Sequence, residues 1–181
     1  MLYEVNSPYE KQVFDWIQSV VVGLNLCPFA AWPLNNQQVR IAVTDAKDDA
    51  TLLADIDQEV ARLDESDPIT LETTLVVAPH HLASFDEYLN MLSVLEMSGW
   101  EGVYQIASFH PDYCFEGIEP SAVENHTNRA PYPIFHLLRE QSVEKALAHY
   151  DDPEQIPENN IKTLQNLSPE QLKQLFGYLI S

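Results

Sequence analysis

Short runs of β-branched residues alternate with longer amphipathic patterns, and this alternation constrains the fold more than any other feature. The runs at 39–43, 70–78 and 103–109 are typical of strands, because β-branched and alternating apolar residues suit a pleated sheet. Between them, segments 48–63 and 82–97 repeat apolar residues three and four apart, which predicts helices. Strands separated by helices of this length favour parallel pairing with right-handed crossovers.

The expected fold class is therefore α/β, with a small three-stranded parallel sheet (a βαβαβ core) flanked by helices. A ferredoxin-like α+β fold with an antiparallel sheet remains the alternative. Additional helices are expected at both ends of the core. They are placed at 8–24, at 28–33, at 133–150, at 161–167 and from 169 onward. Ser7 and Ser168 each precede a proline and are expected to cap their helices.

Residues 1–181 are expected to form a single domain, because this length and an apolar fraction of 45% suit one ordinary core. The chain carries 28 acidic and nine basic residues, a net charge of −19. This excess repels nucleic acid and anionic membranes, so neither is an expected partner. No apolar run approaches the roughly 18 residues of a membrane span. The sequence does not predict the oligomeric state.

The two cysteines, Cys27 and Cys114, are too few and too far apart for a disulfide framework. The N-terminus lacks the basic head and apolar stretch of a signal peptide. A reducing cytoplasm is the expected location. Proline at position 28 could begin a short helix with Cys27 at its N-cap, where aligned peptide dipoles lower a thiol pKa. The alternative is that Cys27 is a small buried apolar side chain.

Residues 110–140 concentrate the unusual side chains of the chain, including three of its six histidines. In a parallel sheet the carboxyl ends of the three strands meet at one edge, where open α/β sheets bind ligands. The segments expected to converge there are 44–45, 79–81 and 110–113. The sequence thus predicts a functional site at this edge.

A helix beginning near Pro133 would align His136, Arg139 and Glu140 on a face that is apolar one turn later. This change of sides has two explanations. Either the three side chains point into a polar pocket floored by apolar residues, or the helix bends or frays and they lie on the surface. A purely structural His–Glu–Arg network is a further alternative.

Two kinds of ligand follow from these residues. Arg129, beside a helix start, is suited to a carboxylate or phosphate, although it could equally pair with an acidic loop. His136 and Glu140, four apart, could hold a metal together with His110 and Asp112. A metal is not the primary expectation, and the sequence leaves any cofactor unknown. Phosphate-loop, dinucleotide and paired-cysteine motifs are missing from the sequence.

Three sequence blocks resemble the signature of a bacterial family of domains of unknown function, number fourteen-fifteen. They are Asn25–Ala30 (NLCPFA), His110–Tyr113 (HPDY) and the block from Asn128 to Glu140 (NRxPYPxxHLLRE). The similarity covers nearly the whole chain. It implies a small cytosolic single-domain protein, with no established activity to carry over. Cys114 lies outside the pattern.

The leading hypothesis is an enzyme, a thiol-dependent transferase or hydrolase acting on a small anionic substrate. Cys27 would be the nucleophile, a histidine the base and a carboxylate its orienting group. The expected catalytic residues are Cys27, His110, Asp112, His136 and Glu140, and the expected substrate-binding residues are Tyr113, Asn125, Asn128, Arg129 and Arg139. The alternatives are a non-catalytic protein that binds a metal or small anion, and a redox sensor acting through Cys27 and Cys114.

Overall fold

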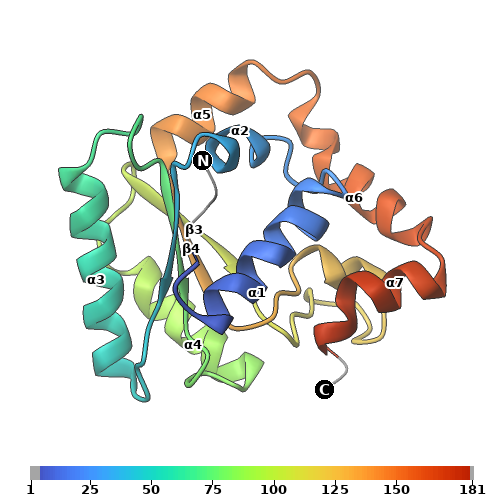
Figure 1. Ribbon diagram of the computed structural model, residues 1–181, viewed down its shortest axis with the longest axis horizontal. Helices are drawn as coiled ribbons and strands as arrows, with labels where there is room; N and C mark the ends of the chain where they lie inside the picture. Colours follow the sequence, from blue (N-terminus) through green and yellow to red (C-terminus); the bar gives the residue numbers. More distant parts are fainter. Residues whose placement is uncertain (1–4, 180–181) are drawn as a thin grey trace.

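The computed structural model describes residues 5–179. Residues 1–4 and 180–181 lie outside the described chain, and residues 1–4 belong to the N-terminal segment for which no signal peptide is expected. A four-stranded mixed sheet forms its centre (Figure 1). The strands are β1 (Val39–Val43), β2 (Thr73–Val77), β3 (Tyr104–Phe109) and β4 (Ile134–Arg139). The helices are α1 (Pro8–Trp16), α2 (Ala31–Asn35), α3 (Asp49–Glu65), α4 (Phe85–Glu96), α5 (Glu140–Ala148), α6 (Ile156–Gln165) and α7 (Pro169–Phe176).

The strand order is β1-β2-β4-β3. Strands β1 and β2 pair in parallel, whereas β4 pairs antiparallel with both β2 and β3. The three expected strands therefore all run in one direction, and β4 fills the gap between two of them. The α/β prediction is confirmed, but a three-stranded sheet was wrong. The β-α-β-α-β-β order also differs from the β-α-β-β-α-β order of a ferredoxin-like fold.

The helix expected from Pro133 was also wrong, because residues 134–139 form strand β4. Both faces of β4 are covered, so its sequence IFHLLR is almost continuously apolar, as is typical of central strands. The helix α5 begins only at Glu140, directly after the strand. The change of sides in the apolar pattern marks this boundary between a strand and a helix.

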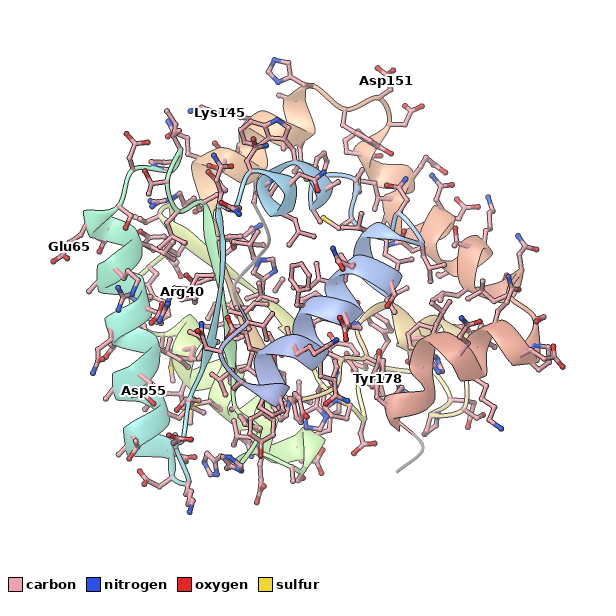
Figure 2. The ribbon with its side chains drawn as sticks, viewed as in Figure 1. Arg40, Asp55, Glu65, Lys145, Asp151 and Tyr178 are labelled. Carbon is pink, nitrogen blue, oxygen red and sulfur yellow. The ribbon has the colours of Figure 1, made fainter. Side chains whose placement is uncertain are left out.

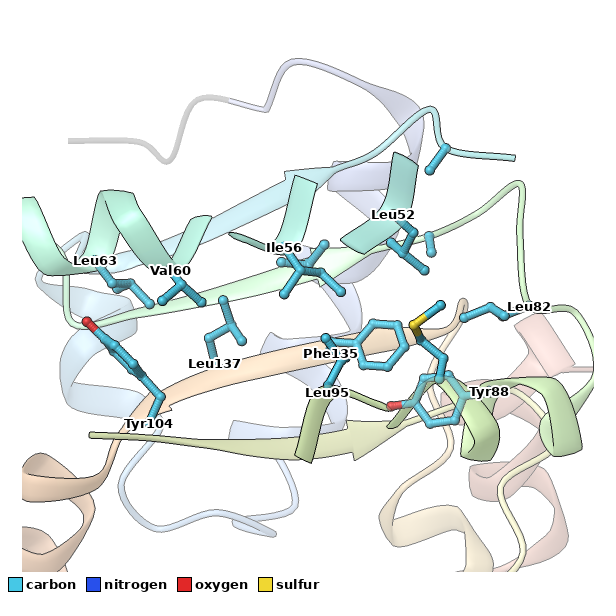
Figure 3. Close-up of a cluster of buried hydrophobic side chains, with 14 residues drawn as sticks. Leu52, Ile56, Val60, Leu63, Leu82, Tyr88, Leu95, Tyr104, Phe135 and Leu137 are labelled. Carbon is cyan, nitrogen blue, oxygen red and sulfur yellow. The ribbon is translucent and has the colours of Figure 1, made fainter. Parts of the chain in front are cut away.

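Two apolar layers hold the sheet. On one face, α3 and α4 pack against alternate strand residues, and the side chains of Leu52, Ile56, Phe135 and Leu137 are fully buried there (Figure 3). On the other face, α1 packs against the sheet, and α6 and α7 lie beyond it (Figure 1). Each buried leucine or isoleucine contributes about 1.5–3 kcal/mol, so both layers are substantial.

The first helix changes its hydrogen-bonding pattern after Trp16. It continues as a π-helix over Ile17–Val22, in which each bond spans one residue more than in an α-helix. The π-helix ends at Gly23, whose N–H donates to the carbonyl of Gln18 at 3.0 Å. A Cβ atom at Gly23 would lie only 2.3 Å from the carbonyl oxygen of Ser19. The position therefore requires glycine for steric reasons.

We expect the substitution Gly23→Ala to lower the free energy of unfolding by about 1–3 kcal/mol, because the backbone must move to admit the methyl group. Urea denaturation monitored by circular dichroism measures this change. Gly177→Ala is the matched control, since no atom lies within 4 Å of its added Cβ and its φ of −58° suits alanine. A loss at Gly23 no larger than at Gly177 would contradict the steric explanation.

Candidate functional site

A large hollow lies on the α1 face of the sheet. Its volume is about 650 Å³, within the range of small-molecule sites. The walls come from α1 and the π-helix that continues it, from segment 27–34, from all four strands and from α5. They are largely apolar. The lining side chains used below are Trp16, Cys27, Phe29, Trp32, Glu72, Thr73, Phe109, His136, Leu138, Lys145 and Ala146.

The cavity lies toward the amino ends of β1, β2 and β3, since it is lined by Val39, Thr73 and Gln105 at the start of these strands. The carboxyl ends of the three strands do meet at one edge, because the strands are parallel. That edge is the opposite end of the sheet. Trp32 of α2 is 66% exposed and Lys145 of α5 is also exposed, so both lining residues reach the solvent.

His136 is the central polar side chain of the cavity wall. It lies on β4, and its Nε2 is 2.8 Å from the hydroxyl oxygen of Thr73 on the paired strand β2. The Thr73 hydroxyl itself donates to the carbonyl of Leu137 at 2.6 Å. A hydroxyl has a single hydrogen, so His136 Nε2 must carry a proton and donate it to Thr73. The tautomer of His136 is thereby fixed.

Burial lowers the pKa of His136 to about 4, which keeps the imidazole neutral at physiological pH. A neutral imidazole protonated on Nε2 has a free lone pair on Nδ1. Within residues 5–179, Nδ1 accepts no hydrogen bond, yet it is not among the buried polar atoms without a partner. Nδ1 therefore retains accessible surface, and the accessible surface of this residue faces the cavity.

Cys27 lines the same cavity from the segment between the π-helix and α2. It was expected at a helix N-cap, but α2 begins at Ala31, and Ala30 is its N-cap residue. The expected dipole effect on the thiol is therefore missing. Burial instead raises the pKa of Cys27, and backbone N–H groups of Phe29 and Ala30 offset this only in part. The thiol is protonated at neutral pH.

His110 lies on the opposite face of the sheet from His136. It is fully buried against the rings of Phe85 and Tyr88. Its Nε2 donates to the carbonyl of Leu82 at 2.9 Å, and its Nδ1 accepts from the backbone N–H of Asp112 at 3.0 Å. Burial lowers the pKa of His110, so the ring is neutral with both nitrogens engaged. Neither nitrogen is offered to a ligand, and Asp112 itself points to the exposed surface.

The residues expected to bind substrate instead hold the loop that follows β3. Arg129 donates to the carbonyls of Tyr113 and Pro120 at 3.1 and 2.7 Å. Asn125 is fully buried, accepts the N–H of Phe115 and donates to the carbonyl of Glu119. These contacts tie the loop after β3 together through its own backbone carbonyl and N–H groups.

Three further residues of that group also make structural contacts. Asn128 donates to the carbonyl of Ser108, whose hydroxyl lies 3.3 Å from that of Tyr113. Arg139 projects to the face opposite His136, because the two are three residues apart on one strand. Its Nη2 donates to the carbonyls of Leu63 and Ser66 at the carboxyl end of α3, at 2.6 and 3.0 Å. It also donates to the carbonyl of Leu71, in the segment before β2, at 3.2 Å.

Of the expected residues, only Cys27 and His136 line this cavity. Glu140, the first residue of α5, does not line the cavity. Cys27 and Cys114 are both free thiols, and Cys114 donates to the carbonyl of Ile118 at 3.2 Å. Within residues 5–179, no group of three or more histidine, cysteine or acidic side chains is placed to hold a metal. The set of His110, Asp112, His136 and Glu140 is divided between different parts of the fold.

Thr73, the partner of His136, was missed by the sequence reasoning. It opens the run TTLVV, which looks like any buried strand, and only the pairing of β2 with β4 brings its hydroxyl to the histidine. The aromatic walls Trp16, Phe29 and Phe109 were also missed. Apolar periodicity locates such residues in a core, but it does not distinguish a core from a cavity wall.

A smaller hollow of about 400 Å³ lies at the carboxyl end of β1, against α3. It is polar, and Arg40 and Asp55, labelled in Figure 2, line it. Arg40 pairs with Glu59 at 2.7 Å, and the hydroxyl of Thr44 donates to Asp55. These contacts join β1 to α3 and engage Arg40, Thr44 and Asp55 within the protein.

The fold and cavity define an α/β protein with a mixed sheet and a large apolar cavity on one face. The sequence matches the family described as Protein of unknown function (DUF1415) over residues 8–174. The chain belongs to this family, and the resemblance noted from its three sequence blocks is confirmed. Neither a search of curated proteins nor one of solved structures found a match. No helix within residues 5–179 has the length and apolar character needed to cross a membrane.

Protonation of His136 is expected to weaken the fold. Its pKa is about 4 in the folded chain and 6.5 in its unperturbed state, so the unfolded chain binds the proton first as pH falls. The neutral His136 ring makes its full contribution to the free energy of unfolding above pH 6.5. This contribution is lost as the pH falls toward 4, and the free energy of unfolding decreases by up to about 3 kcal/mol. Urea denaturation between these pH values, compared for wild type and His136→Phe, isolates this contribution. Equal pH dependence of the two proteins would contradict it.

Proposed function

We propose that this protein binds a small, largely apolar molecule in the cavity on the α1 face. The observation that carries the proposal is an apolar hollow of about 650 Å³ whose wall contains a neutral histidine of fixed tautomer. Apolar clefts with a few convergent polar groups are the usual form of small-molecule sites. The π-helix that forms one wall supports this function, because such segments recur at functional sites.

The charge around the cavity supports an uncharged ligand over the small anion expected from the sequence. Arg129 and Arg139 are occupied by backbone carbonyls, and neither lines the cavity. The charged side chains that line it are Lys145 and Glu72, which are of opposite sign. The net charge of −19 also repels anions at long range.

Ligand entry is tested by blocking the cavity from α5. Ala146 lines the cavity, whereas Ala148 is exposed on the same helix and does not. With the neutral dye N-phenyl-1-naphthylamine as probe, we expect saturable one-to-one binding by wild type and Ala148→Phe. We expect at least about tenfold weaker binding by Ala146→Phe, because its ring occupies the space of the dye.

Dye fluorescence titration measures these affinities, and thermal denaturation checks that both variants fold. Equal binding by Ala146→Phe and Ala148→Phe would place the dye elsewhere on the protein and overturn the proposal. The same holds for a wild-type protein that does not bind the dye.

Thiol chemistry in the cavity is a second candidate function. The observation that favours it is that Cys27 and His136 line the same cavity. In such a reaction the Cys27 sulfur would add to the carbonyl carbon of a ligand, and the π electrons of the carbonyl would move onto its oxygen. The thiol proton would pass to His136 Nδ1 and from there to that oxygen. The raised pKa of Cys27 weighs against this function, because a protonated thiol is a poor nucleophile.

The alkylation rate of Cys27 by iodoacetamide, measured in a Cys114→Ser background, decides between these functions. Because burial raises the pKa of Cys27, we expect alkylation at pH 7 to be slower than that of free cysteine and to increase as pH rises above 9. Mass spectrometry of the modified peptide measures the rate. A rate at pH 7 above that of free cysteine would instead favour the catalytic function.

A further inference from the structure

His136 offers the cavity a hydrogen-bond acceptor and no donor. Its Nε2–H is committed to Thr73, whose hydroxyl is committed in turn to the carbonyl of Leu137. The Thr73 hydroxyl therefore cannot rotate toward a ligand without losing a buried bond to the backbone. What remains is the Nδ1 lone pair, accessible from the cavity and without a partner within residues 5–179.

Aromatic rings line the same cavity as this acceptor. Trp16 and Phe109 meet edge to face with centroids 5.2 Å apart, and Phe109 lies 6.3 Å from the imidazole of His136. Phe29 also lines the cavity, and its ring centroid lies 5.4 Å from that of Tyr150. Aromatic walls favour a flat ligand, because ring faces and edges pack against one another at these separations.

We propose that the ligand is an uncharged aromatic molecule carrying a hydroxyl group, and that His136 Nδ1 selects it by accepting the O–H hydrogen bond. This inference rests on the proposed binding function and names the ligand class for it. A hydrogen-bond acceptor in an apolar site strongly favours a ligand that carries a hydrogen-bond donor. A ligand that places an ether oxygen there leaves two acceptors facing each other without a proton between them. The inference makes His136 the specificity-determining residue of the cavity.

The test uses two ligands that differ only in the donor, 2-naphthol and 2-methoxynaphthalene. Each displaces N-phenyl-1-naphthylamine from the cavity, so one assay gives both affinities. We expect wild type to prefer 2-naphthol by about tenfold or more, the equivalent of one net hydrogen bond. We expect His136→Phe to bind both ligands with affinities within about twofold, because the ring remains and the acceptor is gone.

The two proposals fail in distinguishable ways. Equal affinities of the two naphthalenes for wild type, or a preference for 2-naphthol that persists in His136→Phe, would overturn the role of His136 and leave the binding function standing. Failure of both ligands to displace dye from wild type would overturn the ligand class. Loss of the dye site itself, as judged with Ala146→Phe, would overturn the binding function and this inference with it. The comparison of ligands on wild type needs no variant to fold.

Discussion

The structure depends on one constraint of backbone hydrogen bonding. Strands β2 and β3 run in the same direction but do not pair with each other, and β4 enters between them in the opposite direction. Without β4, the facing edges of both strands would expose unpaired N–H and C=O groups in the middle of the protein. The hydroxyl of Tyr88 secures the end of this insertion, because it accepts the N–H of Phe109 and donates to the carbonyl of Ile134.

The insertion of β4 also determines what each of its side chains does. Because successive residues of a strand point to opposite faces, Phe135 and Leu137 complete the core under α3 and α4, whereas His136 and Leu138 face the cavity. Arg139 follows the first set and meets the carbonyl groups at the end of α3. A sequence block that looks like one functional cluster is thus divided between packing on one face and the cavity on the other.

The regular elements of the first 110 residues could be predicted from the sequence, since β1, β2, β3, α3 and α4 each have an unambiguous periodicity. Strand β4 could not, because Pro133 is equally suited to a helix start and the run IFHLLR carries no alternation. The capping box of Ser168 and Gln171 in α7 was expected and is present, since it is local chemistry. The cavity depends on contacts between residues as distant as Thr73 and His136, which no local pattern reports.

The sequence indicated only part of the candidate site, because contacts between residues distant in the sequence form it. Cys27 and His136 stood out as unusual residues, and the fold brings them to one cavity. His110, Arg129 and Asn125 stood out equally, but their polar atoms bond to backbone groups of Leu82 and of the loop after β3. Sequence alone does not separate these two uses, because buried structural contacts and ligand contacts draw on the same residue types.

The apolar cavity has a consequence for how long the folded chain survives. On the proposed binding function, a ligand in the cavity would add dispersion contacts to its walls and so stabilise the fold. Only the folded chain has this site, so ligand binding would shift the unfolding equilibrium toward the folded state. The lifetime of the protein against proteases, which attack its opened forms, would then follow the amount of ligand around it.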